Sequence, residues 1–189
     1  GEEQSGQIEE IGFSLYTELL ERAVRALKSG KIPDFDSDGE RETEVELHIP
    51  ALIPDDYLPD VHARLTLYKR IAGARDDDAL RELQVEMIDR FGLLPQQVRN
   101  LFAIATLKLR ATPLGIRKLD FGANGGRITF REKPDVDPLT IIKLIQSLPR
   151  VYKLDGQNKL KVILDLPGAS ERIRSAQEVL LLLGARRPT

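Results

Sequence analysis

The residue types that most often perform catalysis are sparse in this 189-residue chain. It has no cysteine, and its two histidines, His48 and His62, are far apart with no paired ligand nearby. A thiolate nucleophile and a cysteine metal site are therefore excluded, and the two histidines lack the spacing typical of a metal motif. The carboxylates cluster at 55–56 and 76–78, where turn and helix-start positions give them capping roles. We predict solvated or capping histidines, no catalytic residue and no metal ligand.

A stretch expected to be helical over 77–91 gathers charged side chains on a single side. At about 100° per residue, four of them fall on the arc opposite the apolar positions. These four are Glu82, Glu86, Asp89 and Arg90. Glu86 and Arg90 are four residues apart, so they should adjoin and form an ion pair. The pattern is typical both of an ordinary solvated helix face and of a surface that contacts a partner.

A second group of charges is basic and lies on two expected hairpins. The first hairpin carries Arg117, Lys118, Arg127 and Arg131, and the second adds Lys153, Lys159 and Lys161. Alternation along a strand would place several of them on one sheet face. Solvated strand charge is one interpretation, and contact with nucleic acid or a partner is the other. The net charge of -2 and the few neighbouring aromatic residues argue against a dedicated nucleic-acid-binding module.

Hydrophobic spacing predicts the elements that position these residues. Apolar residues at three- and four-residue steps predict a helix over 7–28. The acidic run within 31–46 predicts a flexible linker, at whose end Val45, Leu47 and Ile49 alternate as in a short strand that a neighbouring lobe could complete. Three helices follow, and the middle one has aspartates 76–78 at its start and Gly92 at its end.

From Gly115 onward the chain repeats a hairpin followed by a helix. Turn signals occur at Asn124-Gly125 and at 155–158, and helices are expected from Pro138 and from about Ser170. The apolar set expected to face the core from the first of these helices is Ile141, Ile142, Leu144, Ile145 and Leu148. The predicted fold is α+β: a helical layer, then two ββα units sharing a mostly antiparallel four-stranded sheet with helices on one face, plus an N-terminal helical appendage. The predicted boundaries are 1–30, 31–46 and 47–189.

Four phrases of the chain carry a family resemblance. Gly1, Gln4, Ser5 and Gly6 match the Leu-Gly-x-x-Gln-[Ser/Thr]-Gly turn that follows the second helicase lobe in RecG and in the Mfd transcription-repair coupling factors. The later phrases are IPALIPDDYLPDVHARLTLYKRIA, EMIDRFGLLP and LGIRKL, beginning at Ile49, Glu86 and Leu114. RecG has no counterpart to these, so over essentially its whole length the chain resembles the C-terminal piece of the Mfd family. It contains no GxxxxGK[ST] phosphate-binding loop.

The resemblance implies a function for each segment. Residues 1–30 would be the tail of a translocase motor motif whose turn, at Gln4, Ser5 and Gly6, couples nucleotide hydrolysis to DNA movement. Residues 47–189 would be a non-catalytic, autoinhibitory domain that docks on the N-terminal UvrB-like module through Glu86, Asp89, Arg90 and Glu82, masking UvrA recruitment. The parent would be a cytoplasmic ATP- and Mg-dependent translocase on double-stranded DNA that binds RNA polymerase and UvrA. The piece itself would need no cofactor and no membrane. The competing interpretation is an accessory DNA-binding module that uses the basic hairpins.

Overall fold

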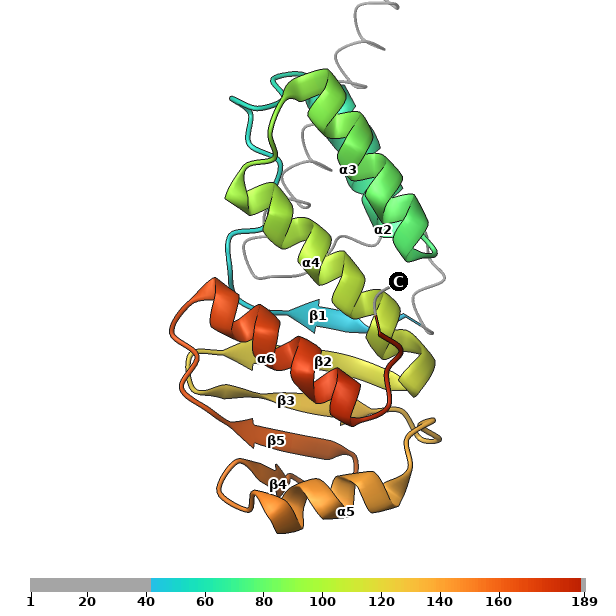
Figure 1. The fold of residues 1–189 in the computed structure, drawn as a ribbon, viewed down its shortest axis with the longest axis vertical. Helices are drawn as coiled ribbons and strands as arrows, with labels where there is room; N and C mark the ends of the chain where they lie inside the picture. Colours follow the sequence, from blue (N-terminus) through green and yellow to red (C-terminus); the bar gives the residue numbers. More distant parts are fainter. Residues whose placement is uncertain (1–41, 188–189) are drawn as a thin grey trace, which may run out of the picture.

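A mixed five-stranded sheet lies at the base of residues 42–187, the part of the chain that the computed structural model describes (Figure 1). Its strands are β1 Glu44–Glu46, β2 Ile116–Gly122, β3 Gly125–Phe130, β4 Tyr152–Leu154 and β5 Lys159–Ile163. Their spatial order is β1-β2-β3-β5-β4, and every neighbouring pair is antiparallel except the parallel pair β1 and β2. The predicted helix over 7–28 and the turn at Gln4, Ser5 and Gly6 lie outside the described residues.

Helices cover one side of this sheet and extend beyond it. They are α2 Val61–Gly73, α3 Asp77–Phe91, α4 Gln96–Ala111, the 3-10 turn Thr112–Leu114, α5 Pro138–Ser147 and α6 Ala169–Leu182. Helices α4 and α6 lie over the sheet, while α2 and α3 pack on α4 beyond the β1 edge (Figure 1). The predicted α+β class is confirmed, and its two ββα units are β2-β3-α5 and β4-β5-α6.

Strand β1 is a fifth strand of the sheet, for which four strands were predicted, and it lies in residues that were expected to be linker. Val45 is buried and pairs with Leu119 of β2, and the Thr43 hydroxyl donates to the Ile116 carbonyl oxygen at 2.6 Å. The strand expected to need a neighbouring lobe is therefore completed by this domain's own β2. Residues 42–46, expected at the end of the linker, belong to the domain, and the rest of that linker lies outside the described residues.

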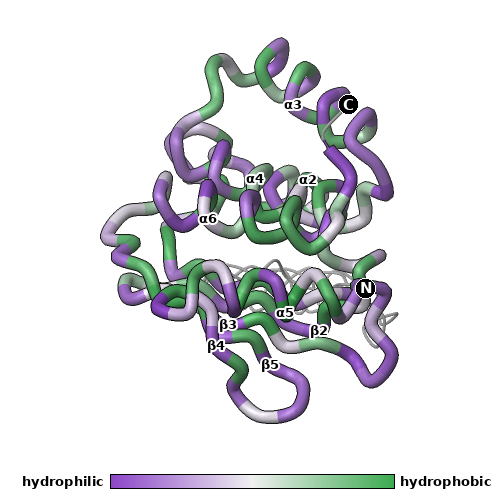
Figure 2. The backbone as a smooth tube through the Cα atoms, turned by 60° about the horizontal axis from the view of Figure 1, so that its bottom comes forward, coloured by the Kyte–Doolittle hydropathy of each residue, from purple (hydrophilic) through white to green (hydrophobic). Residues whose placement is uncertain are grey.

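The core lies between the sheet and the helical layer. Strand register places Val45, Leu119, Ile128 and Leu160 in one row across the sheet, and all four are buried. Because side chains alternate along a strand, the neighbouring positions carry charges to the other face. Figure 2 shows hydrophobic and hydrophilic residues alternating along the strands and helices, with hydrophilic residues in the outer loops.

Helix α5 departs from its predicted place over the sheet. It has no fully buried residue, and Ile142 and Leu148 of its apolar set are about half exposed, whereas Ile141, Leu144 and Ile145 are partly buried. Helices α4 and α6 already cover the sheet face, so α5 lies beside the edge strand β4 (Figure 1). The apolar spacing thus predicted the helix correctly. Of the residues expected to face the core, only Ile141, Leu144 and Ile145 are partly buried.

The turn between β2 and β3 explains why β3 begins with two glycines. The loop is Ala123-Asn124, one residue earlier than predicted. Gly125 has φ 116°, and an added Cβ would lie 2.0 Å from the Val162 carbonyl oxygen of β5. We expect Gly125→Ala to lower the free energy of unfolding by more than about 2 kcal/mol, because it combines a left-handed backbone with a clash against a neighbouring strand.

Chemical denaturation followed by circular dichroism would measure this loss. Gly73→Ala is the matched control, since its Cβ would meet nothing within 4 Å and its backbone is helical. The control should be neutral or stabilising by up to about 1 kcal/mol. Equal stabilities for the two variants would contradict the strand geometry at Gly125.

Candidate functional site

Helix α3 is fixed at both ends by interactions that the sequence predicted. The Asp76 side chain accepts a hydrogen bond from the Ala79 N–H at 2.8 Å, and Gly92, with φ 96°, donates its N–H to the Ile88 carbonyl oxygen. Leu80, Leu83 and Met87 are buried on the inner side. The opposite side of α3 therefore faces outward in a fixed orientation.

The four charged residues predicted on this helix do lie together on its outer side. Glu82, Asp89 and Arg90 are exposed, and Glu86 is partly buried. They line a shallow hollow of about 650 Å³, and we call this surface the α3 face. Its full lining is Asp78, Arg81, Glu82, Val85, Glu86, Asp89 and Arg90. The arrangement presents both signs of charge around an apolar centre.

The ion pair predicted within α3 is replaced by a pair between helices. Glu86 Oε2 lies 2.5 Å from Arg70 Nη1 of α2, whereas Arg90 places its guanidinium over the Phe91 ring, 4.8 Å from the ring centroid. The sequence did not reveal Arg70, because this contact depends on how α2 packs against α3. The negative charge of Glu86 is partly compensated, and the positive charge of Arg90 is held near the end of the helix.

An exposed apolar residue of this surface was missed from the sequence. Val85, 58% exposed, lies in the lining of the hollow. On a helical projection Val85 falls only about 40° from Asp89, so the projection contained the signal. Apolar side chains surrounded by charged ones resemble the centre and rim of a protein interface.

A buried ion pair holds the first turn of α3 against α4. Arg110 Nη2 lies 2.8 and 2.7 Å from the two carboxylate oxygens of Asp77, and the Arg110 side chain is only 6% exposed. Among the described residues, the Nε and Nη1 atoms of Arg110 are buried without a hydrogen-bond partner. A charge held this way depends strongly on its one carboxylate.

Tyr57 holds the other end of α3. Its hydroxyl lies 2.9 Å from the Gly92 carbonyl oxygen and 3.2 Å from that of Met87, and its ring meets Phe91 edge to face at 6.0 Å. Burial raises the pKa of the Tyr57 hydroxyl above its ordinary value, so the group remains a neutral donor. Both ends of the α3 face are thus attached to the rest of the domain.

The two histidines do not assemble a catalytic group with each other. The backbone N–H of His62 donates to Asp60 Oδ1 at the start of α2, so this residue takes part in capping the helix. His48 Nε2 lies 2.9 Å from Asp120 Oδ1, and within the described residues Glu46, His48 and Asp120 form one group whose ligand atoms lie within 4.8 Å of one another. Glu46 is also paired with Lys118 at 3.2 Å. His48, Asp120 and Glu46 thus each have a described side-chain partner inside the protein.

The basic residues divide between two places. Lys118 and Arg127 lie on the sheet face opposite the helices, where each has an acidic partner, Glu46 and Asp155 respectively. Arg117 and Arg131 instead line a hollow at the end of β3, and Lys159, at the border of the sheet face, lines it as well. The expectation that several basic residues share a sheet face holds for Lys118, Arg127, Lys153, Lys159 and Lys161, which the register places on the same side.

This chain resembles known proteins in both fold and sequence. The family model of the TRCF domain matches residues 47–141, so the chain contains a TRCF domain. The crystal structure of a transcription-repair coupling factor C-terminal domain has the same fold, with a TM-score of 0.60 over 76% of this chain and 95% of that one, at 24% identity. These findings place the chain in the class of TRCF domains.

Whole relatives identify the family more closely. The transcription-repair-coupling factor of Escherichia coli (strain K12) is 51% identical over 95% of this chain, and that of Haemophilus influenzae is 48% identical over 98%. The chain belongs to the transcription-repair coupling factor (Mfd) family and corresponds to its C-terminal TRCF domain. It spans 16% of the length of each of these two relatives. No helix within 42–187 is long and apolar enough to cross a membrane.

Proposed function

We propose that this chain is the regulatory, autoinhibitory part of an ATP-driven translocase that moves on double-stranded DNA, displaces stalled RNA polymerase and recruits UvrA for excision repair. The domain docks on the N-terminal UvrB-like module of the same protein and covers the surface that recruits UvrA. Release on contact with RNA polymerase then uncovers it. The chain supplies this contact surface and, in residues 1–30, the tail of the motor motif, whereas the phosphate-binding loop and the rest of the motor belong to other parts of the protein.

The observation that carries the proposal is the α3 face. It combines acidic and basic side chains around Val85, and the buried Asp77–Arg110 pair and Tyr57 fix its orientation. Charged contacts give specificity for one partner, and a small apolar centre provides a binding core. Reversible docking suits such a surface, because a closed state favoured by a few kcal/mol still leaves an open population that a ligand can select.

A second candidate function is DNA binding by the basic sheet face. The register supports it by placing Lys118, Arg127, Lys153, Lys159 and Lys161 on one side. Acidic Glu46, Asp120 and Asp155 lie among them and pair with described partners, which lowers the net positive charge of that face. A DNA grip would lose affinity steeply with salt, because phosphate contacts release counterions.

Binding of this chain to the isolated N-terminal UvrB-like module tests the docking function. We expect measurable affinity by isothermal titration calorimetry, and a loss of at least about tenfold in the variant Glu86→Arg/Asp89→Arg/Arg90→Glu, because attractive contacts become repulsive. The matched control reverses Glu171, Arg174 and Glu178, three exposed residues of α6 with the same charges. Equal affinities for the two variants would place the docking surface elsewhere.

A further inference from the structure

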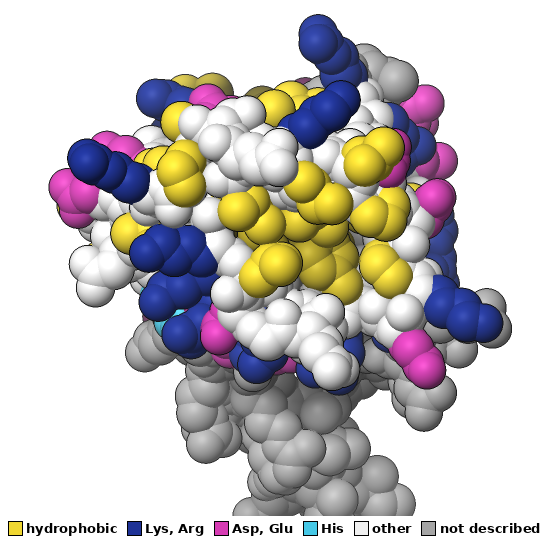
Figure 3. Space-filling view, turned by 90° about the horizontal axis from the view of Figure 1, so that it is seen from below, with side chains coloured by type: hydrophobic (Ala, Val, Ile, Leu, Met, Phe, Trp, Pro, Cys, Tyr) yellow, Lys and Arg dark blue, Asp and Glu magenta, His cyan; other side chains and the backbone are white. Residues whose placement is uncertain are grey.

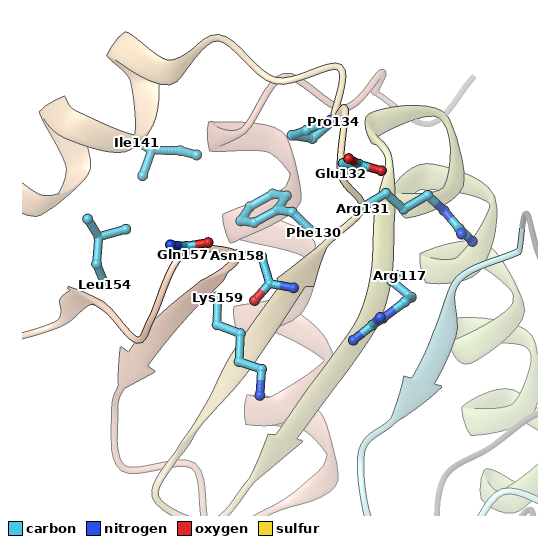
Figure 4. A pocket seen from close by; sticks show the side chains of 10 residues that line it. All are labelled: Arg117, Phe130, Arg131, Glu132, Pro134, Ile141, Leu154, Gln157, Asn158 and Lys159. Atoms are coloured by element: carbon cyan, nitrogen blue, oxygen red, sulfur yellow. The ribbon is translucent and has the colours of Figure 1, made fainter.

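A second hollow, of about 700 Å³, lies between α5, the end of β3 and the β4–β5 turn, at the opposite end of the domain from α3 (Figures 1 and 4). Three basic residues, Arg117, Arg131 and Lys159, are part of its lining, and Glu132 is the one acidic residue among its described lining. Within residues 42–187 no ion pair involves Arg117 or Lys159. The hollow therefore has an excess of positive charge. The neighbouring Lys118 and Arg127, by contrast, are each paired with an acidic residue.

The other side of the hollow is apolar. Figure 4 shows Ile141 and Leu154 on one side, Phe130 between, and the two arginines on the other. Leu154 is 66% exposed, and α5 carries two further exposed apolar residues, Leu139 and Ile142. Figure 3 shows hydrophobic side chains gathered on this lower face, with basic and acidic residues around them. A contiguous exposed apolar patch with a charged rim is typical of a binding surface.

The described chain begins close to this hollow. Arg131 Nη2 donates to the carbonyl oxygen of Glu42, the first described residue, at 3.1 Å. The residues just before it, Pro33–Glu40, read PDFDSDGE and so alternate acidic positions with Phe35 between Asp34 and Asp36. In an extended chain, alternate side chains point to opposite sides, which places the carboxylates on one side and the Phe35 ring on the other. The acidic side of such a segment is complementary to the basic side of the hollow, and the Phe35 ring is complementary to the apolar side.

We propose that the acidic segment Pro33–Glu40 of this chain binds in the hollow. The carboxylates of Asp34 and Asp36 face the basic side, and the Phe35 ring lies against the apolar side. Eight residues extend up to about 28 Å, which is ample for the segment to cross the hollow and continue to Glu42. Because the segment is covalently attached, its effective concentration is on the order of millimolar, so even a weak contact is populated.

The contact is testable in the full chain because the sequence contains no tryptophan. Phe35→Trp creates a single fluorescent reporter. We expect acrylamide to quench the fluorescence of this tryptophan about twofold less than in the same protein carrying Arg117→Glu/Lys159→Glu. This factor corresponds to a tethered contact that is formed about half of the time. Both substituted residues are exposed, so circular dichroism should show an unchanged fold. Raising NaCl to about 1 M, where screening acts within about 3 Å, should also release the reporter.

The matched control is Lys153→Glu/Lys161→Glu, which makes the same charge change on the sheet face outside the hollow. The control should keep the protected reporter, and Asp34→Asn/Asp36→Asn should lose it. The proposal is overturned if the control and the hollow variant release the reporter equally, or if the reporter is as quenchable in the parent as in the hollow variant. It is also overturned if protection disappears on dilution, since that would indicate a second copy in the hollow.

Discussion

In the full-length factor, the variant Glu86→Arg/Asp89→Arg/Arg90→Glu is expected to bind UvrA more tightly and to hydrolyse ATP faster without polymerase. If the undocked, open state makes up about 1–10% of the resting protein, loss of docking on the UvrB-like module raises the apparent UvrA affinity by about 10- to 100-fold, since that affinity scales with the open fraction. Replacing attractive contacts by repulsive ones costs several kcal/mol, which suffices for this shift. Titration with UvrA and a steady-state ATPase assay would measure it.

The variant should leave the domain itself nearly intact. The one described salt bridge that the variant loses joins Glu86 to Arg70. This partly exposed pair contributes about 0.2–1 kcal/mol, so the melting temperature of this chain should fall by a few degrees at most. Reversal of Glu171, Arg174 and Glu178 on α6 is again the control and should change neither activity. If the α3 variant bound UvrA and hydrolysed ATP as the wild-type protein does, the α3 face would be ruled out as the docking surface.

The largest loss of stability is expected from Asp77→Ala. It leaves the Arg110 guanidinium buried with its carboxylate removed, and Nε and Nη1 already lack a hydrogen-bond partner within residues 42–187. Breaking a buried pair from one side typically costs about 3–5 kcal/mol. A domain of this size loses roughly 2–4 °C per kcal/mol, so the melting temperature should fall by about 10 °C or more. Thermal unfolding followed by circular dichroism would measure the fall.

The neighbouring aspartate is the matched control. Asp78 is exposed and pairs with Arg81 one turn along α3, so Asp78→Ala should cost no more than about 1 kcal/mol. Removing both partners of the buried pair, as Asp77→Leu/Arg110→Met, should recover much of the loss, since no uncompensated charge remains. A loss below about 1 kcal/mol in Asp77→Ala would show that water or other groups solvate Arg110.

Features encoded by nearby residues were predictable from the sequence. The start of α3 at Asp76 and its end at Gly92 depend on contacts within one helical turn, and both were predicted. The two hairpins and the helices after them were predicted for the same reason. The grouping of Glu82, Glu86, Asp89 and Arg90 on the outer side of α3 likewise follows from helical periodicity alone. The docking role attached to this face came from the family resemblance and stays a prediction.

Features that depend on packing between distant segments were not predictable. Strand β1 pairs with β2 across about seventy residues, and nothing in its three residues specifies that partner. The pairing of Glu86 with Arg70 depends on the angle at which α2 and α3 meet. The exposure of α5 depends on α4 and α6 having already covered the sheet. Periodicity shows which side of an element is apolar, and tertiary packing decides whether that side is buried.

Strand β1 also has a mechanical consequence. It is the first element of the described chain, and it runs parallel to β2, so a pull along the strand from its N-terminal side loads the β1–β2 hydrogen bonds in shear. Bonds loaded in shear share the force, whereas bonds that are peeled apart break one at a time. A motor that precedes this domain would therefore transmit tension directly into the sheet.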